Sequence, residues 1–179
     1  MFPRRYPRTA SGIMAVVATP SCAFASDNTA PAHPKALAAI LEADQGAVPS
    51  YGDDALTQRA EDRIRDAFET PDAKVLFAFT GTAANIIGLT SGIRPWQEIL
   101  CSDIAHVYID EAGGPVRISG AILTPLPSDD GIIDRALLDR AITRRGDVHH
   151  SHPAIVTITQ STENGRVWGA TEIADFVEH

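Results

Sequence analysis

The chain has 179 residues, of which 44% are hydrophobic and 21% charged, and a formal net charge of −8 at neutral pH. This composition is that of a globular protein with room for one α/β domain. No basic stripe exists to release counterions from a nucleic acid, so nucleic acid is not an expected partner. Neither is a membrane, since no apolar run is long enough to span one. The two cysteines, Cys22 and Cys101, lack C-x-x-C spacing, which favours a reducing, cytoplasmic compartment over a disulfide framework.

Residues 1–25 are predicted to be an N-terminal extension, disordered or wrongly included by the choice of start codon. They contain three arginines, a short apolar run and Ala23-Phe24-Ala25, a pattern similar to a signal-peptide cleavage site. Because the apolar run is short and Pro20 interrupts it, we favour Met14 as the true start over secretion.

Two helices are expected next. The first is Ala- and Leu-rich and runs from about Lys35 to Glu42, and Asp53 or Asp54 is expected to cap the second. In the second helix, apolar residues recur every four positions and predict a stripe that docks on the rest of the protein. These residues are Leu56, Ala60, Ile64 and Phe68.

Tyr51 lies in the loop between these helices, beside a glycine and two carboxylates. Such a loop is typical either of a surface that faces a substrate or of an ordinary turn before a capped helix. The residues leave both interpretations open.

The stretch from Lys74 to Gly92 is predicted to be the centre of the fold. Val75–Phe79 is almost wholly apolar, as in a strand covered on both faces, and Ala83–Leu89 continues as a helix. The Thr80-Gly81-Thr82 junction would direct free amides and the positive end of the helix dipole at one spot, which suits a phosphate. An ordinary capped turn remains the alternative. The junction matches neither a nucleotide P-loop nor a dinucleotide fingerprint.

The rest of the chain alternates strands and helices. Strands are predicted at 98–101, 122–126 and 154–159, a helix at 134–145, and a final helix capped by Thr171. This alternation indicates right-handed βαβ units around a parallel sheet. The loop 160–166 follows the last strand, at the sheet edge where ligands approach.

Histidines mark two further places. His106 lies one helical turn before Asp110 and close to Glu111, ahead of two glycines expected to end the segment, and it suits acid–base chemistry, ring stacking or a structural role. His149, His150 and His152 are close together, but no carboxylate converges on them in the pattern, so no metal site is expected.

Five segments together resemble the low-specificity threonine aldolases and related β-eliminating lyases. They are Ser26-Asp27-Asn28-Thr29, Tyr51-Gly52-Asp53-Asp54, Thr80-Gly81-Thr82-Ala83-Ala84-Asn85, Ala105-His106 with Glu111-Ala112-Gly113-Gly114, and Gln160-Ser161-Thr162-Glu163-Asn164-Gly165. Their order and spacing carry the resemblance, which runs from about Phe24 to the end. It implies one α/β domain over 26–179, the N-terminal half of the large domain of an aminotransferase-like, fold type I enzyme, with a mostly parallel sheet and flanking helices.

The resemblance also implies a function. Enzymes of this family use pyridoxal 5′-phosphate to cleave threonine, allo-threonine or similar β-hydroxy-α-amino acids reversibly into glycine and an aldehyde, as dimers or tetramers. The reaction needs a proton removed from the β-hydroxyl while the cofactor ring takes up the electrons released at Cα.

Residue roles follow from the same resemblance. The pair Gly81-Thr82 matches residues that hold the cofactor phosphate, and His106 matches a histidine that stacks on the pyridine ring and is a candidate base. Glu111 matches an acidic residue near the substrate hydroxyl, as a candidate base or water-holder. Ser26 matches a residue that binds the substrate carboxylate, and Tyr51 one that approaches the substrate from the neighbouring subunit.

The sequence departs from the family in its lysines. The family's lysine binds the cofactor covalently, but this chain contains only Lys35 and Lys74, and neither matches that position. The family's H-x-D-G-A-R segment is also absent. We therefore expect an N-terminal fragment that is inactive by itself. A non-catalytic module that binds phosphate or another subunit, and a type I lyase acting on a larger β-substituted amino acid, are the alternatives.

Overall fold

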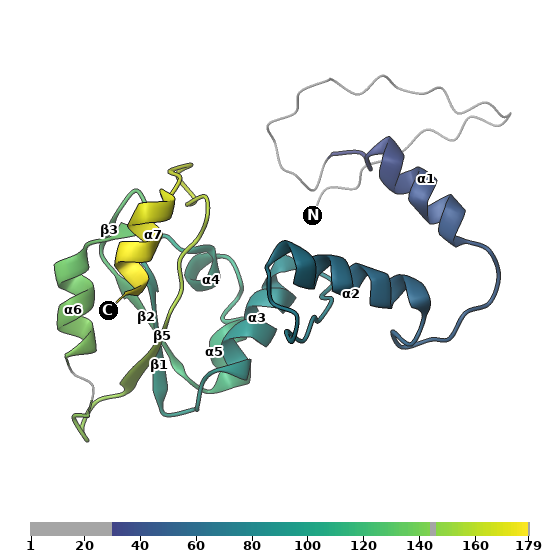
Figure 1. The fold of residues 1–179 in the computed structure, drawn as a ribbon. Helices are drawn as coiled ribbons and strands as arrows, with labels where there is room; N and C mark the ends of the chain where they lie inside the picture. The colour runs from purple at the N-terminus through teal and green to yellow at the C-terminus, as the bar shows by residue number, and fades with distance from the viewer. Residues whose placement is uncertain (1–29, 144–145, 179) are drawn as a thin grey trace, which may run out of the picture. The chain divides into compact units, whose positions relative to one another are not determined.

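The computed structural model describes residues 30–143 and 146–178 (Figure 1). The chain divides into two compact units, Met1–Ala73 and Lys74–His179. The expected N-terminal extension, residues 1–25, and the candidate substrate residue Ser26 lie outside the described residues. No helix in the described part is both long and apolar enough to cross a membrane.

The first unit contains two helices, α1 (Pro34–Ala43) and α2 (Ala55–Ala67). Asp54 caps α2, because its Oδ1 accepts the backbone N–H groups of Leu56 and Thr57 at 2.9 Å each. Its Oδ2 also accepts the hydroxyl of Thr57 at 2.6 Å. Both helices were expected, and Asp54 is the cap of the two candidates.

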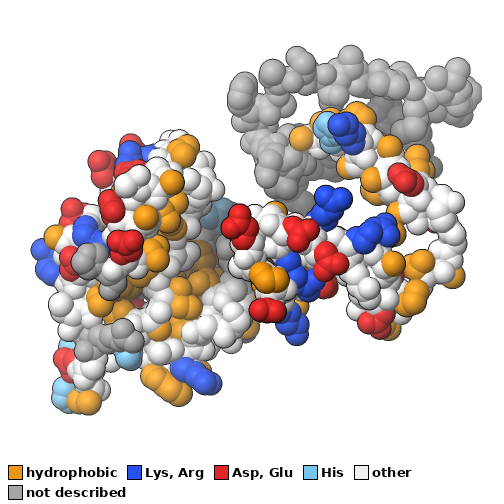
Figure 2. Space-filling model, in the orientation of Figure 1, with side chains coloured by type: hydrophobic (Ala, Val, Ile, Leu, Met, Phe, Trp, Pro, Cys, Tyr) orange, Lys and Arg blue, Asp and Glu red, His pale blue; other side chains and the backbone are white. Residues whose placement is uncertain are grey.

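Within the first unit, the apolar stripe predicted on α2 is largely exposed. Leu56 is 41% exposed and Phe68 is 74% exposed. No described residue of this unit is fully buried, so two short helices do not form a core by themselves. The remaining surface of α2 is mixed in charge (Figure 2), and Arg65 forms ion pairs with Glu61 and Asp62 at 2.8 Å.

The second unit is built on a three-stranded parallel sheet with the order β2-β1-β5. The central strand is β1 (Gln97–Ser102), between β2 (Ile122–Leu126) and β5 (His152–Val156). All three strands were predicted, although β5 begins two residues earlier than expected. The prediction of a parallel sheet is confirmed.

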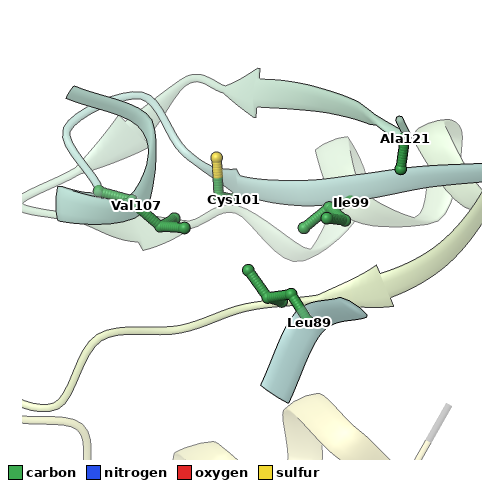
Figure 3. Packing of buried hydrophobic residues seen from close by; sticks show 6 residues of the cluster. Leu89, Ile99, Cys101, Val107 and Ala121 are labelled. Atoms are coloured by element: carbon green, nitrogen blue, oxygen red, sulfur yellow. The ribbon is translucent and has the colours of Figure 1, made fainter. Parts of the chain in front are cut away.

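Helices cover both faces of this sheet, as the alternating side chains of β1 require. Ile99 and Cys101 belong to one buried cluster, together with Leu89 of α3 (Gly81–Ser91) and Val107 of α4 (His106–Ile109) (Figure 3). Leu100 points to the other face, in a cluster with buried residues of α6 (Arg135–Ile142) and with Phe176 of α7 (Ala170–Val177). The core is therefore split by the sheet into two layers.

The prediction of a strand at Val75–Phe79 is wrong. These residues are irregular in the structure, and Phe77 is 57% and Phe79 104% exposed. A strand exists only where a neighbour completes its backbone hydrogen bonds, and none of the described strands pairs with this segment. The apolar composition predicted a buried strand, but the segment has no partner strand among the described residues and most of its residues are exposed.

Three smaller elements also differ from expectation. A hairpin of β3 (Ser128–Asp129) and β4 (Ile132–Ile133) was not predicted. A short helix, α5 (Gly114–Ser119), begins where the glycines were expected to end the segment, because proline at 115 suits a first helical turn. Helix α7 begins after Gly169, before Thr171, and the carboxylate of Glu172 accepts the N–H of Gly169 at 2.8 Å.

Candidate active site

The first component of the site is the N-terminus of α3. The hydroxyl of Thr80 caps the helix by accepting the N–H of Ala83 at 3.2 Å. Among the described residues, the N–H groups of Gly81 and Thr82 have no hydrogen-bond partner. A Cβ on Gly81 would meet no atom within 4 Å. The turn is thus an N-capped turn that also leaves two amides open to an anion.

The second component is a histidine and a buried carboxylate. Nδ1 of His106, the first residue of α4, lies 3.1 Å from Oε1 of Glu111. The imidazole is about half exposed, whereas the Glu111 side chain is completely buried. Asp110, the carboxylate expected one turn from His106, is bonded to it through the backbone, its N–H donating to the His106 carbonyl at 2.9 Å.

Asn85 joins the two components. Its side-chain Nδ2 donates to the same oxygen, Oε1 of Glu111, at 2.6 Å. Asn85 lies four residues after Gly81 on α3, so the two residues share one face of the helix. The Asn85–Glu111 hydrogen bond therefore links the face of α3 that carries the open N–H group of Gly81 to the carboxylate beside His106.

Two glycines after Glu111 allow the chain to turn there and α5 to lie close to α3. Gly113 has a φ of 69°, a left-handed conformation that glycine adopts without strain. A Cβ on Gly114 would lie only 2.9 Å from Cδ1 of Ile86, so a larger residue at this position would require the end of the Ile86 side chain to shift.

A second carboxylate holds the backbone of His106. Oε1 of Glu163 accepts the N–H of His106 at 2.6 Å and the hydroxyl of Thr159 at 3.2 Å. Sequence reasoning quoted Asn85 and Glu163 as parts of motifs but gave neither a role. The available signals were the one-turn spacing of Asn85 from Gly81, and the position of Glu163 in the loop after β5.

Neither Tyr51 nor His150 has a hydrogen bond to this cluster in the described structure. Tyr51 belongs to the Met1–Ala73 unit, is fully exposed, and has a φ of 64°, in the left-handed region. His150 pairs with Asp147 at 2.9 Å. The pKa of Asp147 is lowered, first by the N–H of His149 and then by the side chain of His150. Within the described ranges, no group of three or more histidine, cysteine or acidic residues could hold a metal ion.

An apolar cavity of about 260 Å³ lies among α6, β5 and α7. Its lining includes Leu138 and Phe176, which belong to the opposite face of the sheet from α4. Apart from Arg135 the lining is apolar. Acid–base chemistry is therefore to be sought at His106 and not in this cavity.

The residues present fit a phosphorylated, planar cofactor. Unpartnered amides at a helix N-terminus suit a phosphate dianion, and the positive end of the helix dipole adds to the attraction. The half-exposed imidazole of His106 offers a flat surface and ring nitrogens that can form hydrogen bonds. Oε2 of Glu111 is buried with no hydrogen-bond partner in the described structure, so this carboxylate keeps an unused acceptor.

Comparison with known proteins identifies the class. The fold is part of that of the type I pyridoxal phosphate enzymes, an α/β fold with a parallel sheet and flanking helices. Residues 23–179 match the model of the β-eliminating lyases, and the chain belongs to this family. The resemblance and the fold class drawn from the sequence are thus confirmed.

Several relatives are threonine aldolases. The chain is 42% identical to the low specificity L-threonine aldolase of Pseudomonas sp. (strain NCIMB 10558), over 84% of this chain and 43% of that protein. It is 41% identical, with the same coverage, to the low specificity L-threonine aldolase of Pseudomonas aeruginosa. The solved structure of Leishmania major threonine aldolase matches with a TM-score of 0.76 and 27% identity, over 82% of this chain and 43% of that one. The chain spans less than half the length of these relatives.

Proposed function

We propose that this chain is the cofactor-binding part of a pyridoxal phosphate-dependent lyase of the threonine aldolase type. The reaction is the reversible cleavage of threonine, allo-threonine or a similar β-hydroxy-α-amino acid into glycine and an aldehyde. The observation that carries the proposal is the pair of bonds from Oε1 of Glu111, one to Asn85 on α3 and one to His106. They connect an anion-binding helix face to an acid–base group.

In this proposal Gly81 and Thr82 bind the cofactor phosphate through their open N–H groups. His106 stacks on the cofactor ring, and Glu111 holds the imidazole from its buried position. The bound cofactor supplies an electron sink for the electrons released at Cα.

Proton transfer at the substrate hydroxyl is assigned to His106 and Glu111. An imidazole can both accept and donate a proton, so it suits removal of a proton from the β-hydroxyl during cleavage and its return in the reverse reaction. Ser26 and Tyr51 are proposed to bind the substrate, Tyr51 from a neighbouring subunit of a dimer or tetramer. The complete enzyme is proposed to act in the cytoplasm.

The isolated chain is proposed to be inactive. Its two lysines, Lys35 and Lys74, match no cofactor-binding lysine of the family, and the relatives extend well beyond the matched region. The same observation favours a second candidate, a non-catalytic module that binds phosphate or another subunit. Cofactor binding without cleavage is expected of both candidates, so activity in a completed protein must separate them.

Cofactor binding is tested at Gly81, which is the first residue of α3. Gly81→Pro removes one open N–H, and the first helical position tolerates proline. Thr80, with φ −144° and ψ 164°, already has the extended conformation that precedes proline. Gly81→Ala is the matched control, because it keeps the N–H and adds a Cβ in open space.

Equilibrium dialysis of the 179-residue chain would compare pyridoxal 5′-phosphate with pyridoxal, which lacks the phosphate. Preference for the phosphorylated form is expected, with affinity about ten-fold weaker in Gly81→Pro, the value of one hydrogen bond to a charged group. Gly81→Ala should bind as the unchanged chain does. Equal binding of both compounds would argue against the phosphate site.

Activity is tested in a chimera. The chain would replace the matched 43% of the Pseudomonas sp. relative, and acetaldehyde release from threonine would be measured. Activity that is lost in His106→Ala supports the aldolase. A chimera that folds and binds the cofactor but releases no aldehyde would favour the non-catalytic module.

A further inference from the structure

Asn85 contacts Glu111 but has no role of its own in the proposed function. It is exposed on α3, yet its Nδ2 reaches a carboxylate oxygen of a completely buried side chain, 26 residues further along the chain. An exposed asparagine does not need such a partner, because water can satisfy its amide. Glu111, by contrast, is buried away from water, so each hydrogen bond that its carboxylate accepts offsets part of the cost of burying it.

The two bonds to Glu111 fall on the same oxygen. Oε1 receives Asn85 Nδ2 at 2.6 Å and faces His106 Nδ1 at 3.1 Å, while Oε2 has no partner in the described structure. An amide NH₂ group can only donate, so Oε1 acts as an acceptor toward Asn85. This oxygen is accordingly set up to accept from the imidazole as well.

The proton position on the ring follows from that network. A neutral imidazole carries one proton, and the nitrogen that faces an acceptor must be the one that donates. His106 Nδ1 faces Oε1 and therefore holds the proton. Nε2 is left with its lone pair, on a side chain that is about half exposed.

We propose that Asn85 is a positioning residue that acts through Glu111 to hold neutral His106 in the Nδ1–H form, leaving Nε2 as the proton acceptor. Glu163 fixes the backbone of the same histidine through the N–H of His106, so the ring is the part that Asn85 and Glu111 control. The use of Nε2 as a base rests on the proposed function; the tautomer does not.

The tautomer can be read directly by NMR. The 179-residue chain is labelled with ¹⁵N-histidine, and long-range ¹H–¹⁵N correlations are recorded without cofactor or substrate, at a pH where the ring is neutral. The sequence contains six histidines, so His106→Gln identifies the signals of His106 by their loss. The expected pattern is a protonated nitrogen at Nδ1 and an unprotonated one at Nε2. The opposite pattern in the unchanged chain overturns the proposal.

Asn85→Ala tests the role of Asn85. Alanine suits an exposed helical position, so the fold should survive. Without the Asn85 bond the carboxylate can turn Oε1 away from Nδ1, so the tautomer ratio is expected to shift about five-fold toward the Nε2–H form. Asn85→Gln keeps an amide donor and should retain more of the Nδ1–H form than Asn85→Ala. An unchanged ratio in a folded Asn85→Ala chain would refute the positioning role.

The chain offers a matched control. Asn164 also donates its Nδ2 to a carboxylate, Oδ1 of Asp130 at 3.2 Å, but it has no hydrogen bond to Glu111. Asn164→Ala should leave the His106 signals unchanged; an equal shift there would show a general loss of structure and overturn the assignment to Asn85. Failure of the chain to bind pyridoxal phosphate would not alter this result, so the two proposals fail separately.

Discussion

The side chain of Gln160 forms two hydrogen bonds with the backbone of Trp168, donating to its carbonyl and accepting its N–H, both at 2.9 Å. These bonds fix the loop after β5 against the start of the last helix. The indole of Trp168 is only 4% exposed and packs edge to face with Phe176, with ring centroids 5.2 Å apart.

Gln160→Ala should therefore loosen this corner. Two backbone groups lose their partner, and the expected loss of stability is about 1 to 3 kcal/mol. In a Trp96→Phe background, Trp168 is the sole tryptophan and its fluorescence should shift to longer wavelength. Unchanged emission in Gln160→Ala would contradict the role of these bonds.

The buried carboxylate of Glu98 on β1 depends on the hydroxyl of Thr124 on the neighbouring strand, which donates to its Oε1. Thr124→Val keeps the shape and removes this donor, so unfolding in urea should show a loss of about 1 to 3 kcal/mol. Thr124→Ser retains the hydroxyl and is the control. A Thr124→Val variant as stable as the unchanged chain would contradict the role of this hydrogen bond.

Gly131 and Gly165 both have a φ of 84°, but their surroundings differ. A Cβ at Gly131 would lie 2.8 Å from Cβ of Thr162, whereas one at Gly165 would meet nothing within 4 Å. Gly165→Ala should lower the stability by about 1 to 2 kcal/mol, the energy of placing a residue with a Cβ in the left-handed conformation. Gly131→Ala should cost about 1 to 3 kcal/mol more, from overpacking. Equal thermal midpoints would refute this difference.

Burial raises the pKa of the Cys101 thiol to about 11, with smaller contributions from Asp103 and Glu163. At neutral pH the thiol should therefore react very slowly with a disulfide reagent in a folded Cys22→Ser chain and rapidly after denaturation. Since the folded pKa is raised, the associated stability is complete below the ordinary thiol pKa and is lost as the pH rises toward 11. Rapid labelling of the folded chain at neutral pH would contradict this burial.

Asp54 should make α2 sensitive to acid. The Thr57 hydroxyl, followed by the Thr57 N–H, lowers the pKa of this carboxyl. Its contribution is therefore present above the ordinary aspartate pKa and is lost as the pH falls through the lowered folded value. Asp54→Asn keeps a cap without a charge, so thermal midpoints followed by helical circular dichroism should converge with those of the unchanged chain on acidification. The neighbouring Asp53→Asn is the control, because the described hydrogen bonds that cap α2 are all accepted by Asp54.

How far the sequence could predict this protein depended on the distance between the interacting residues. The cap at Asp54 and the strand around Leu100 follow from local chemistry and from a short apolar run, and both were expected. Asp130-Gly131 is a typical hairpin-turn sequence, and the two residues have φ values of 49° and 84°. The hairpin was not predicted because strands of two residues are too short to show an alternation of apolar and polar side chains.

The remainder was set by contacts that no local pattern encodes. The Asn85–Glu111 bond joins residues 26 apart, and the His106–Glu163 bond joins residues 57 apart. The sequence placed His106 close to Glu111 and the resemblance to a family gave both residues a role, but neither identified Asn85 as their link. The prediction of a strand at Val75–Phe79 was wrong because a strand also depends on a distant contact, a partner strand elsewhere in the chain.

The exposed segment that begins at Lys74 gives the protein a simple route to dissection. Lys74 and Lys35 are the only lysines of the chain, and Lys74 is the first residue of the second unit. A lysine-specific endoprotease should therefore cut at this junction and release residues 75–179 in one piece. That product would carry the sheet, the open amides of α3 and the His106 cluster, so its solubility can be measured apart from that of the N-terminal helices.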